Sequence, residues 1–150
     1  MPEQTASSFA AATSELPSIA APLAALYRSF WSLESVPAVT LELCRLRVAQ
    51  LLGSELAWQH EEIPLSSDQR EQLTHWPGSS AFSEAQKACL EVAEIHAMDA
   101  RSITDDQADA VKHHYGEVGY VALIQALGVF DAMTRLGLIW DLSTLEIDAS

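Results

Sequence analysis

Apolar residues recur at helical spacing along nearly the whole chain. Near the N-terminus, Pro17 and Pro22 bound or open a helix, and its apolar stripe follows i, i+3, i+4, i+7 spacing over Leu23, Leu26, Tyr27 and Phe30. No segment shows the sustained alternation of a strand, and no Asn-Gly or Asp-Gly pair separates two apolar runs. The pattern therefore predicts an all-α fold, a single-domain helical bundle of about six helices.

Capping residues place the boundaries of the later helices. A long helix is expected near residues 40–60, and Gly53 is expected to weaken or bend it. Three capping-box signatures follow: Ser66 with Gln69, Ser83 with Gln86, and Thr104 with Gln107. They predict helices to about residue 76, then over about 84–98 and about 105–115, where Gly116 ends the fifth helix. The last predicted helix, about 118–140, is apolar on most sides, which favours a central position or a subunit interface.

The composition is that of one globular domain. The chain has 150 residues, of which 49% are hydrophobic, with only six Gly and six Pro. Residues 1–14, rich in Ala, Ser and Thr, are expected to form a flexible N-terminal segment before a helical domain over residues 15–150. The first residues carry acids but no base, so no positively charged leader is expected and the cytoplasm is the predicted compartment.

The charge excludes one class of partner. Because 21 acidic residues face 8 basic ones, the net charge is −13, which repels phosphate backbones, and no nucleic-acid partner is expected. The longest apolar stretch, residues 119–140, is interrupted by Gln125, Asp131 and Arg135. A membrane span needs about 20 nearly uncharged residues, so no membrane partner is expected.

The cysteines and histidines give no metal or cofactor signal. Cys44 and Cys89 are too few for a disulfide framework, and both lie in apolar helical patterns where a free cysteine usually acts as a small hydrophobe. The other possible metal ligands are His75, His96, His113 and His114, and no two of these histidines have HxxxH or HExxH spacing. No metal and no cofactor are therefore predicted.

The segment from Leu41 to Glu62 carries the most informative motif. It opens Glu42-Leu43-Cys44-Arg45-Leu46-Arg47 and then runs through an apolar stretch to Gly53. This resembles the active-site helix of the alkylhydroperoxidase D-like superfamily, also called the carboxymuconolactone decarboxylase family, which opens Glu-Leu-x-x-Leu-Arg. In peroxidase members a Cys-x-x-Cys pair follows the Gly, whereas this chain has Ser54 and Ala57 at those positions. The resemblance therefore covers the scaffold and lacks the redox cysteines.

Further segments extend the resemblance over most of the chain, roughly from Leu26 to Leu142. In chain order they are Leu26–Trp31, Ala81–Ala88, Ile103–Asp106 and His113–Glu117. The resemblance implies an all-helical fold whose protomers assemble into trimers or hexamers. In the peroxidase members it also implies an antioxidant reaction, in which the cysteine pair attacks a hydroperoxide and is re-reduced by a dithiol partner.

The same resemblance supplies the candidate site residues. In the family, a Glu that matches Glu42 and a His seven residues after the first Cys form a proton relay. The seventh position after Ser54 is Glu61 in this chain, and His60 precedes it, which on a helix is a rotation of about 100°. The candidate catalytic residues are Glu42, Ser54 and His60, and the candidate pocket-lining residues are Ala57, Trp58 and Glu61.

Glu42 has a functional and a structural interpretation. A buried carboxylate at this position could transfer protons as a general acid or base. Alternatively, Glu42 pairs with Arg45 or Arg47, three and five residues away, and the first spacing is an ordinary helix contact.

His60 and Ser54 also have a functional and a structural interpretation each. His60 could relay protons to Glu42 or hold a ligand carboxylate, or it could face solvent at a helix end beside Glu61 and Glu62. As an activated nucleophile Ser54 would need a base within hydrogen-bond reach. Otherwise it is a small residue that packs where the chain bends after Gly53.

Two functions follow from these alternatives. The first is an enzyme with a thiol-independent small-molecule site built around Glu42, acting on a small organic acid or lactone as in the decarboxylase branch. The second is a non-catalytic oligomeric binding or interaction protein that kept the family core. A peroxidase with relocated thiols at Cys44 and Cys89 is a third alternative, without other support in the sequence. Convergence of Glu42 and His60 on an enclosed, partly polar cavity would favour the enzyme.

Overall fold

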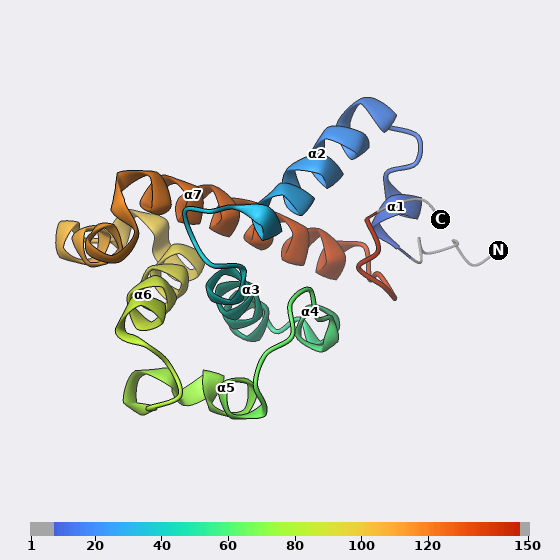
Figure 1. Cartoon of the computed structure of the whole chain (residues 1–150). Coiled ribbons are helices and arrows are strands. Elements are labelled where there is room, and N and C mark those ends of the chain that lie inside the picture. The colour runs from blue at the N-terminus through green and yellow to red at the C-terminus, as the bar shows by residue number, and fades with distance from the viewer. Residues whose placement is uncertain (1–7, 148–150) are drawn as a thin grey trace.

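The computed structural model describes residues 8–147, and every regular element among them is helical (Figure 1). The α-helices are α1 (Phe9–Ala12), α2 (Pro17–Ser29), α3 (Ala38–Leu52), α4 (Glu55–Gln59), α5 (Ser67–Gln72), α6 (Glu84–Asp99) and α7 (Asp105–Ile139). Three short 3-10 helices directly continue α2, α5 and α6: η1 (Phe30–Ser32), η2 (Leu73–Gly78) and η3 (Ala100–Ser102). The predicted all-α fold is confirmed, with seven α-helices in the described residues where about six were expected.

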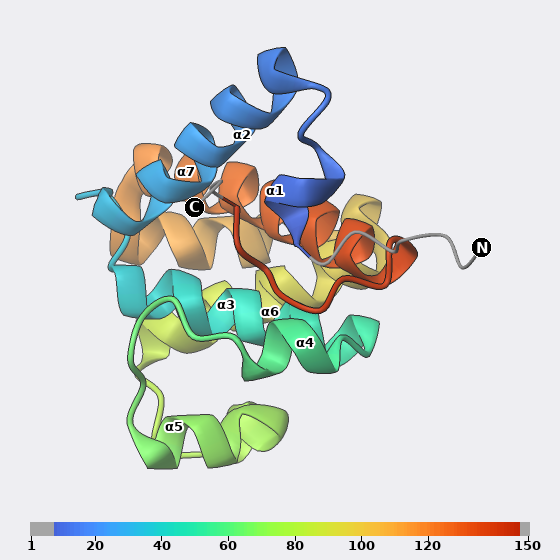
Figure 2. The same ribbon diagram turned by 90° about the vertical axis from the view of Figure 1, so that its right-hand side faces the viewer.

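The long helix α7 lies in the middle of the molecule. It runs between α2 on one side and α3 and α6 on the other, with α5 at the far side of α3 (Figures 1 and 2). Fully buried leucines of α3, α6 and α7 meet in one core, among them Leu46, Leu90 and Leu127. Removing these side chains from water is the main favourable contribution to folding. The apolar character of the last predicted helix thus corresponds to a central position.

An aromatic cluster fixes α2 and η1 on α7. The Trp31 ring stacks on Phe130 with a centroid distance of 5.5 Å, and Tyr27 and Phe30 meet Phe130 edge-on. The apolar stripe predicted for this segment therefore faces the core, except that Leu26 is 43% exposed. By holding α2 against α7, the cluster brings the Tyr27 hydroxyl to the region of the candidate site.

Two of the three predicted capping boxes are complete. Ser83 and Thr104 each accept a hydrogen bond from the backbone N–H three residues later, and the Gln side chain at that position accepts one from the cap residue's N–H. Ser66 also caps its helix, by accepting from the backbone N–H of Gln69. The Gln69 side chain, however, donates to the carbonyl oxygen of Ala81 at 3.1 Å, so the third predicted box is only half formed.

The prediction of a single long helix near residues 40–60 is wrong. Gly53 ends α3 in the left-handed region, with φ of 73°, and its N–H bonds back to the last turn. Ser54 then caps the separate helix α4, with its Oγ accepting from the backbone N–H of Ala57. The chain direction therefore changes at Gly53, and residues after it do not continue the helical phase of α3.

Gly116 interrupts α7 where the sequence predicted a helix end. It has φ of 71° and ψ of −179°, a conformation that side chains rarely adopt, between two helical segments that otherwise form one element. By length and composition α7 could span a membrane, with a mean hydropathy of 1.4 in its most apolar window, of which 39% is buried. Since core helices meet the same criterion, the expected absence of a membrane partner stays a prediction.

The N-terminal segment differs in part from the flexible region expected over residues 1–14. Residues 1–7 lie outside the described part of the chain. Phe9, in contrast, is buried in α1 and packs on Trp140 with a centroid distance of 5.8 Å. The backbone N–H of Ala10 donates to the carbonyl oxygen of Glu146 at 3.0 Å, so α1 is held against the C-terminal segment.

Candidate functional site

Glu42 lies on α3 with no exposed surface, and both of its carboxylate oxygens are engaged. Oε1 accepts a hydrogen bond from Arg45 Nε at 2.5 Å, one helical turn along α3. Oε2 accepts from the backbone N–H groups of Glu62 at 2.6 Å and Ile63 at 3.0 Å. A buried carboxylate is stable only when it is paired and hydrogen-bonded, and Glu42 meets both conditions.

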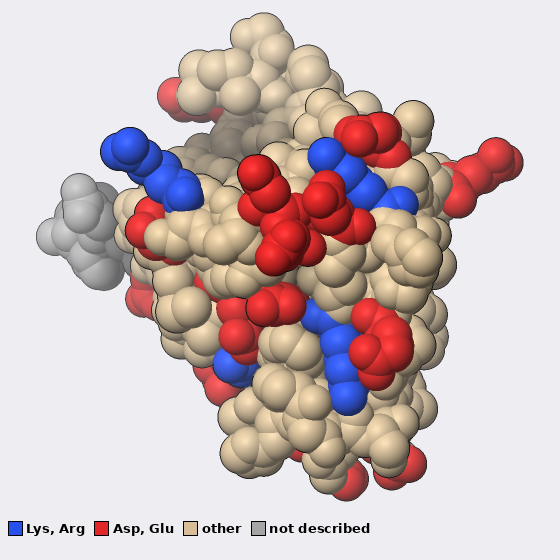
Figure 3. All heavy atoms as spheres, turned by 90° about the vertical axis from the view of Figure 1, so that its left-hand side faces the viewer, with Lys and Arg blue, Asp and Glu red and all other residues tan. Residues whose placement is uncertain are grey.

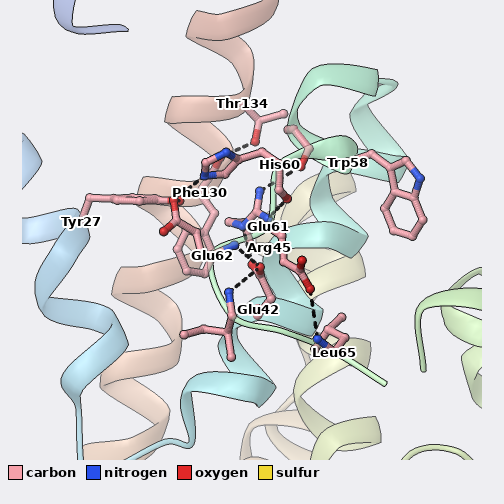
Figure 4. Close-up of polar contacts among 12 residues, drawn as sticks. Tyr27, Glu42, Arg45, Trp58, His60, Glu61, Glu62, Leu65, Phe130 and Thr134 are labelled. Atoms are coloured by element: carbon pink, nitrogen blue, oxygen red, sulfur yellow. Dashed lines mark hydrogen bonds and ion pairs between the residues drawn. The ribbon is translucent and has the colours of Figure 1, made fainter. Parts of the chain in front are cut away.

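Arg45, which is only 3% exposed, connects α3 to α4 and to the turn that follows α4. Beyond its bond to Glu42, Nη1 donates to the carbonyl oxygen of Ala57 at 3.0 Å and Nη2 to that of His60 at 2.6 Å (Figure 4). These carbonyls belong to the last turn of α4 and its C-cap, where backbone acceptors have no partner within the helix. The Glu42–Arg45 pair therefore binds four backbone groups between Ala57 and Ile63, two carbonyl oxygens and two N–H groups.

His60 does not contact the Glu42 carboxylate with its ring. Its Nε2 lies 2.6 Å from Glu62 Oε1, and the same oxygen accepts a hydrogen bond from the Tyr27 hydroxyl at 3.0 Å. Figure 4 shows the imidazole pointing toward Glu62 and Thr134, while Glu42 lies on the other side of the turn. The His60 and Glu62 side chains are 32% and 25% exposed, so the group is reached by solvent.

The surroundings raise the pKa of Tyr27 and lower the pKa of Glu62. Burial raises the pKa of Tyr27 well above its ordinary value, and the neighbouring Glu62 charge adds to that effect. Burial alone would raise the pKa of Glu62, but the hydrogen bonds from His60 and Tyr27 outweigh it and hold that pKa below its ordinary value. Glu62 is therefore a carboxylate stabilised in its charged form, and Tyr27 a phenol stabilised in its neutral form.

The remaining site residues predicted from the sequence do not share one pocket. Ser54 and Trp58 line an open groove of about 520 Å³, together with Arg47 and Gln50. Ala57 lines a separate, nearly filled cavity of about 20 Å³ under Tyr27 and Arg45. Glu61 lines neither, and its carboxylate accepts from the backbone N–H of Leu65 at 3.3 Å. Neither space is lined by Glu42 or His60, so neither joins these two residues to Ser54.

Ser54 and Trp58 each make contacts that stabilise α4 and its neighbours. Ser54, which is 5% exposed, is the N-cap of α4, and its hydroxyl accepts from the backbone N–H of Ala57. The Trp58 ring packs under the Arg70 guanidinium at 4.3 Å from the ring centroid, while Arg70 Nη2 donates to the Trp58 carbonyl oxygen at 2.6 Å.

Both cysteines are free and fully enclosed in the core. Burial raises the pKa of Cys44 well above its ordinary value and that of Cys89 to about 12, so both thiols stay protonated. The thiolate is the reactive form, so this environment is unsuited to peroxide chemistry. Within residues 8–147 no group of three His, Cys, Asp or Glu side chains is placed to hold a metal ion.

Sequence reasoning missed the partner of His60. The sequence indicated Glu62 only as an acidic neighbour of a solvent-facing His60. It indicated Tyr27 only as part of an apolar stripe. A His-x-Glu spacing at the end of a helix was the one local signal for the His60–Glu62 pair. The contribution of Tyr27, 35 residues earlier, had no local signal, because it depends on how α2 packs on α7.

Comparison with known proteins gives support at the level of the fold. No protein-family model matches the chain, and no curated protein matches it. A solved structure from Agrobacterium tumefaciens, a protein of unknown function suggested to be the antioxidant defence protein AhpD, superposes with a TM-score of 0.75. The alignment covers 91% of this chain and 97% of that one at 16% identity. The chain therefore has the alkylhydroperoxidase D-like fold, as the resemblance of its motifs implied.

Proposed function

We propose that this chain is a non-catalytic, oligomeric interaction protein of the cytoplasm that uses the alkylhydroperoxidase D-like fold as a scaffold. The observation that carries the proposal is the state of Glu42. Its carboxylate is buried, one oxygen is taken by Arg45, and the other by two backbone N–H groups. A general acid or base must reach the proton it transfers, and Glu42 lines neither the Ser54–Trp58 groove nor the cavity under Tyr27 and Arg45.

The thiol positions support the same proposal. Ser54 serves as a helix cap and Ala57 is buried, where peroxidases of the resembling family have their cysteine pair. The alternative thiols at Cys44 and Cys89 are protonated and enclosed. A peroxidase with relocated cysteines is therefore disfavoured, as is an enzyme centred on Glu42.

Exposed apolar side chains support self-association. Val118 and Ile139, near the two ends of the long second segment of α7, are each 73% exposed. Each has an exposed apolar neighbour, Val121 at 52% one turn from Val118 and Leu138 at 45% beside Ile139, and contiguous exposed apolar patches mark surfaces that another chain covers. The resemblance to the family, whose protomers form trimers or hexamers, points the same way.

A second function is favoured by one observation. The His60 imidazole is oriented by the Glu62 carboxylate at 2.6 Å and remains partly exposed, which is the arrangement of a general base. In that case the reaction would use Glu62 and Tyr27 rather than Glu42. His60 lines neither of the two spaces described above, and this places the second function behind the first.

Sedimentation velocity at micromolar concentration tests the proposal. We expect an oligomer, and we expect Val118→Asp combined with Ile139→Asp to convert it to a monomer, because a charge in an apolar interface is costly to desolvate. His114→Asp, an exposed change on the same helix, is the matched control and should leave the assembly intact. A wild-type monomer contradicts self-association.

The catalytic half of the proposal is tested separately. The purified protein, supplied with a hydroperoxide and a dithiol, should show no turnover above the buffer rate. Turnover that disappears in Cys44→Ser or Cys89→Ser would restore the relocated-thiol alternative. Loss of turnover in His60→Gln but not in Glu42→Gln would instead identify the second candidate.

A further inference from the structure

The cavity of about 20 Å³ under Tyr27 and Arg45 has one wall that does not come from a helix. Tyr27 and Thr134 line this cavity, and Figure 4 shows the His60 imidazole with Tyr27 on one side and Thr134 on the other. The non-helical wall is Leu145, which belongs to the segment after α7. A cavity of this volume admits about one water molecule, so no ligand fits while Leu145 is in place.

The segment that supplies Leu145 turns back where α7 ends. Asp141 has a φ of 50°, in the left-handed region, and the N–H of Leu142 donates to the carbonyl oxygen of Gly137 at 3.0 Å. Leu142 itself is buried in the core. Residues 143–147 then return between α1 and α4, drawn in red in Figure 2. We call residues 143–147 the lid.

The lid is held less firmly than the helices beneath it. It lies outside regular secondary structure, and three of its five residues are exposed. Its half-buried side chains are Leu145 and Ile147, and the Glu146 carbonyl oxygen accepts from the N–H of Ala10 at 3.0 Å. Segments with few buried apolar side chains open locally at a lower free energy than global unfolding requires. The lid can therefore open while the core of α3, α6 and α7 stays folded.

Opening the lid exposes an apolar wall with two polar groups beside it. Phe130 and Met133 form the apolar wall, and Tyr27 and Thr134 carry the hydroxyls. Each hydroxyl already donates its hydrogen, from Tyr27 to Glu62 at 3.0 Å and from Thr134 to the Phe130 carbonyl oxygen at 2.7 Å. Because a hydroxyl oxygen also accepts, both remain available to a hydrogen-bond donor on a ligand.

The charges of the molecule indicate a neutral ligand. Arg45 is the cation of the lining, and its donors are already engaged by Glu42 and by the carbonyl oxygens of Ala57 and His60. The whole chain has a net charge of −13, and acidic side chains also outnumber basic ones on the face viewed in Figure 3. An anion would therefore be repelled.

We propose that residues 143–147 are a lid over a small-molecule site beside His60, in which Leu145 takes the place of a ligand's apolar group when the lid is closed. The ligand is a small neutral molecule with a branched aliphatic group about the size of a leucine side chain and one hydroxyl or N–H group. Its aliphatic group displaces Leu145 from Phe130 and Met133, and its polar group donates to Tyr27 or Thr134. The site depends neither on self-association nor on catalysis, so it can fail while the proposed function holds, and the reverse.

Isobutanol is the first probe, because its alkyl group has the shape of the leucine side chain and its hydroxyl supplies the donor. In NMR titrations of the full chain, isobutanol should shift the backbone amide signals of Ala10, Leu145 and Glu146. Millimolar concentrations are needed, since a ligand of so few atoms binds weakly. An absence of shifts, or shifts confined to the Ser54–Trp58 groove, would overturn the proposal.

A disulfide that locks the lid distinguishes entry under the lid from binding elsewhere. A Cβ atom on Gly137 would lie 3.5 Å from Leu145 Cδ2, so Gly137→Cys combined with Leu145→Cys brings two thiols within reach of each other. The reduced form of this double variant should bind isobutanol, and the oxidised form should lose the amide shifts. Equal shifts in the two forms would contradict the lid.

Leu145→Asp tests the lid without a ligand, because a charge beside Phe130 and Met133 is costly and favours the open state. Tetranitromethane should then nitrate Tyr27, which is buried in the closed state, at least about tenfold faster than in Thr144→Asp. Thr144→Asp adds the same charge at an exposed position of the lid and is the matched control. Equal nitration rates, measured by mass spectrometry, would show that Leu145 does not close the site. If Leu145→Asp fails to fold by circular dichroism, the disulfide variant decides.

Discussion

The Glu42–Arg45 pair and the His60–Glu62–Tyr27 group lie on two sides of one turn and differ in their access to water. Glu42 and Arg45 are 0% and 3% exposed. Apart from the bond between them, their side chains form hydrogen bonds with backbone groups of the turn. In the second group, His60 and Glu62 are about a quarter to a third exposed and bond to side chains instead. Two glutamates on opposite sides of one turn therefore differ in their environment: Glu42 is enclosed and bonded to the backbone of the turn, whereas Glu62 is reached by solvent.

The largest effect is expected from breaking the buried pair. Arg45→Met should lower the free energy of unfolding by about 3–5 kcal/mol, because it leaves the Glu42 charge buried without its partner. Urea denaturation measures the change, and Glu42→Leu combined with Arg45→Met should cost less than the sum of the single changes.

The exposed pair Arg135–Asp131 on α7 is the control for this experiment. At 51% exposure of Arg135, Arg135→Met should cost no more than about 1 kcal/mol. If Arg45→Met cost as little as this control, the pair would not be structural, and Glu42 would return as a candidate catalytic group.

Ser54 sharpens the comparison at the start of the turn. As the N-cap of α4, Ser54→Ala should lower stability by about 1 kcal/mol, and Ser54→Thr, which keeps the hydroxyl, should restore most of it. Thermal or urea unfolding checks both. A Ser54→Ala protein as stable as the wild type would contradict the cap assignment.

The smallest effect concerns pH and the partly exposed group. The pKa of Glu62 is lowered in the folded state, so the unfolded chain binds the proton first as pH falls, and the stability that Glu62 contributes disappears in acid. Glu62→Gln should therefore cost less than about 1 kcal/mol at neutral pH, as partly exposed pairs do, and progressively nothing below the ordinary range of a glutamate.

Tyr27→Phe is the internal control for that profile. It keeps the Glu62 carboxylate but removes one of the hydrogen bonds that lower its pKa, so its pH dependence should lie between the wild type and Glu62→Gln. Urea unfolding at a series of pH values gives all three curves. Identical curves for wild type and Glu62→Gln would show that Glu62 does not titrate differently on folding.

Local signals accounted for much of the fold and for part of the site. The capping hydroxyls Ser83 and Thr104 marked helix starts correctly because a cap depends only on residues within one turn. Gly53 was noticed but misjudged as a bend, because a glycine inside a helical pattern is compatible both with continuation and with a left-handed end. The pairing of Glu42 with His60 came from the proton relay of the resembling family, which no local signal in this chain tests, and the structure turns the His60 ring to Glu62.

By itself the sequence determined the helical class, most helix boundaries, the absence of the cysteine pair and the spacing that pairs Glu42 with Arg45. The tertiary structure alone decided that both oxygens of Glu42 are consumed, that His60 turns to Glu62, and that Tyr27 joins them from α2. The division has a physical reason. Caps and i, i+3 contacts are set within a few residues, whereas burial and long-range hydrogen bonds depend on the packing of α2, α3 and α7 into one core.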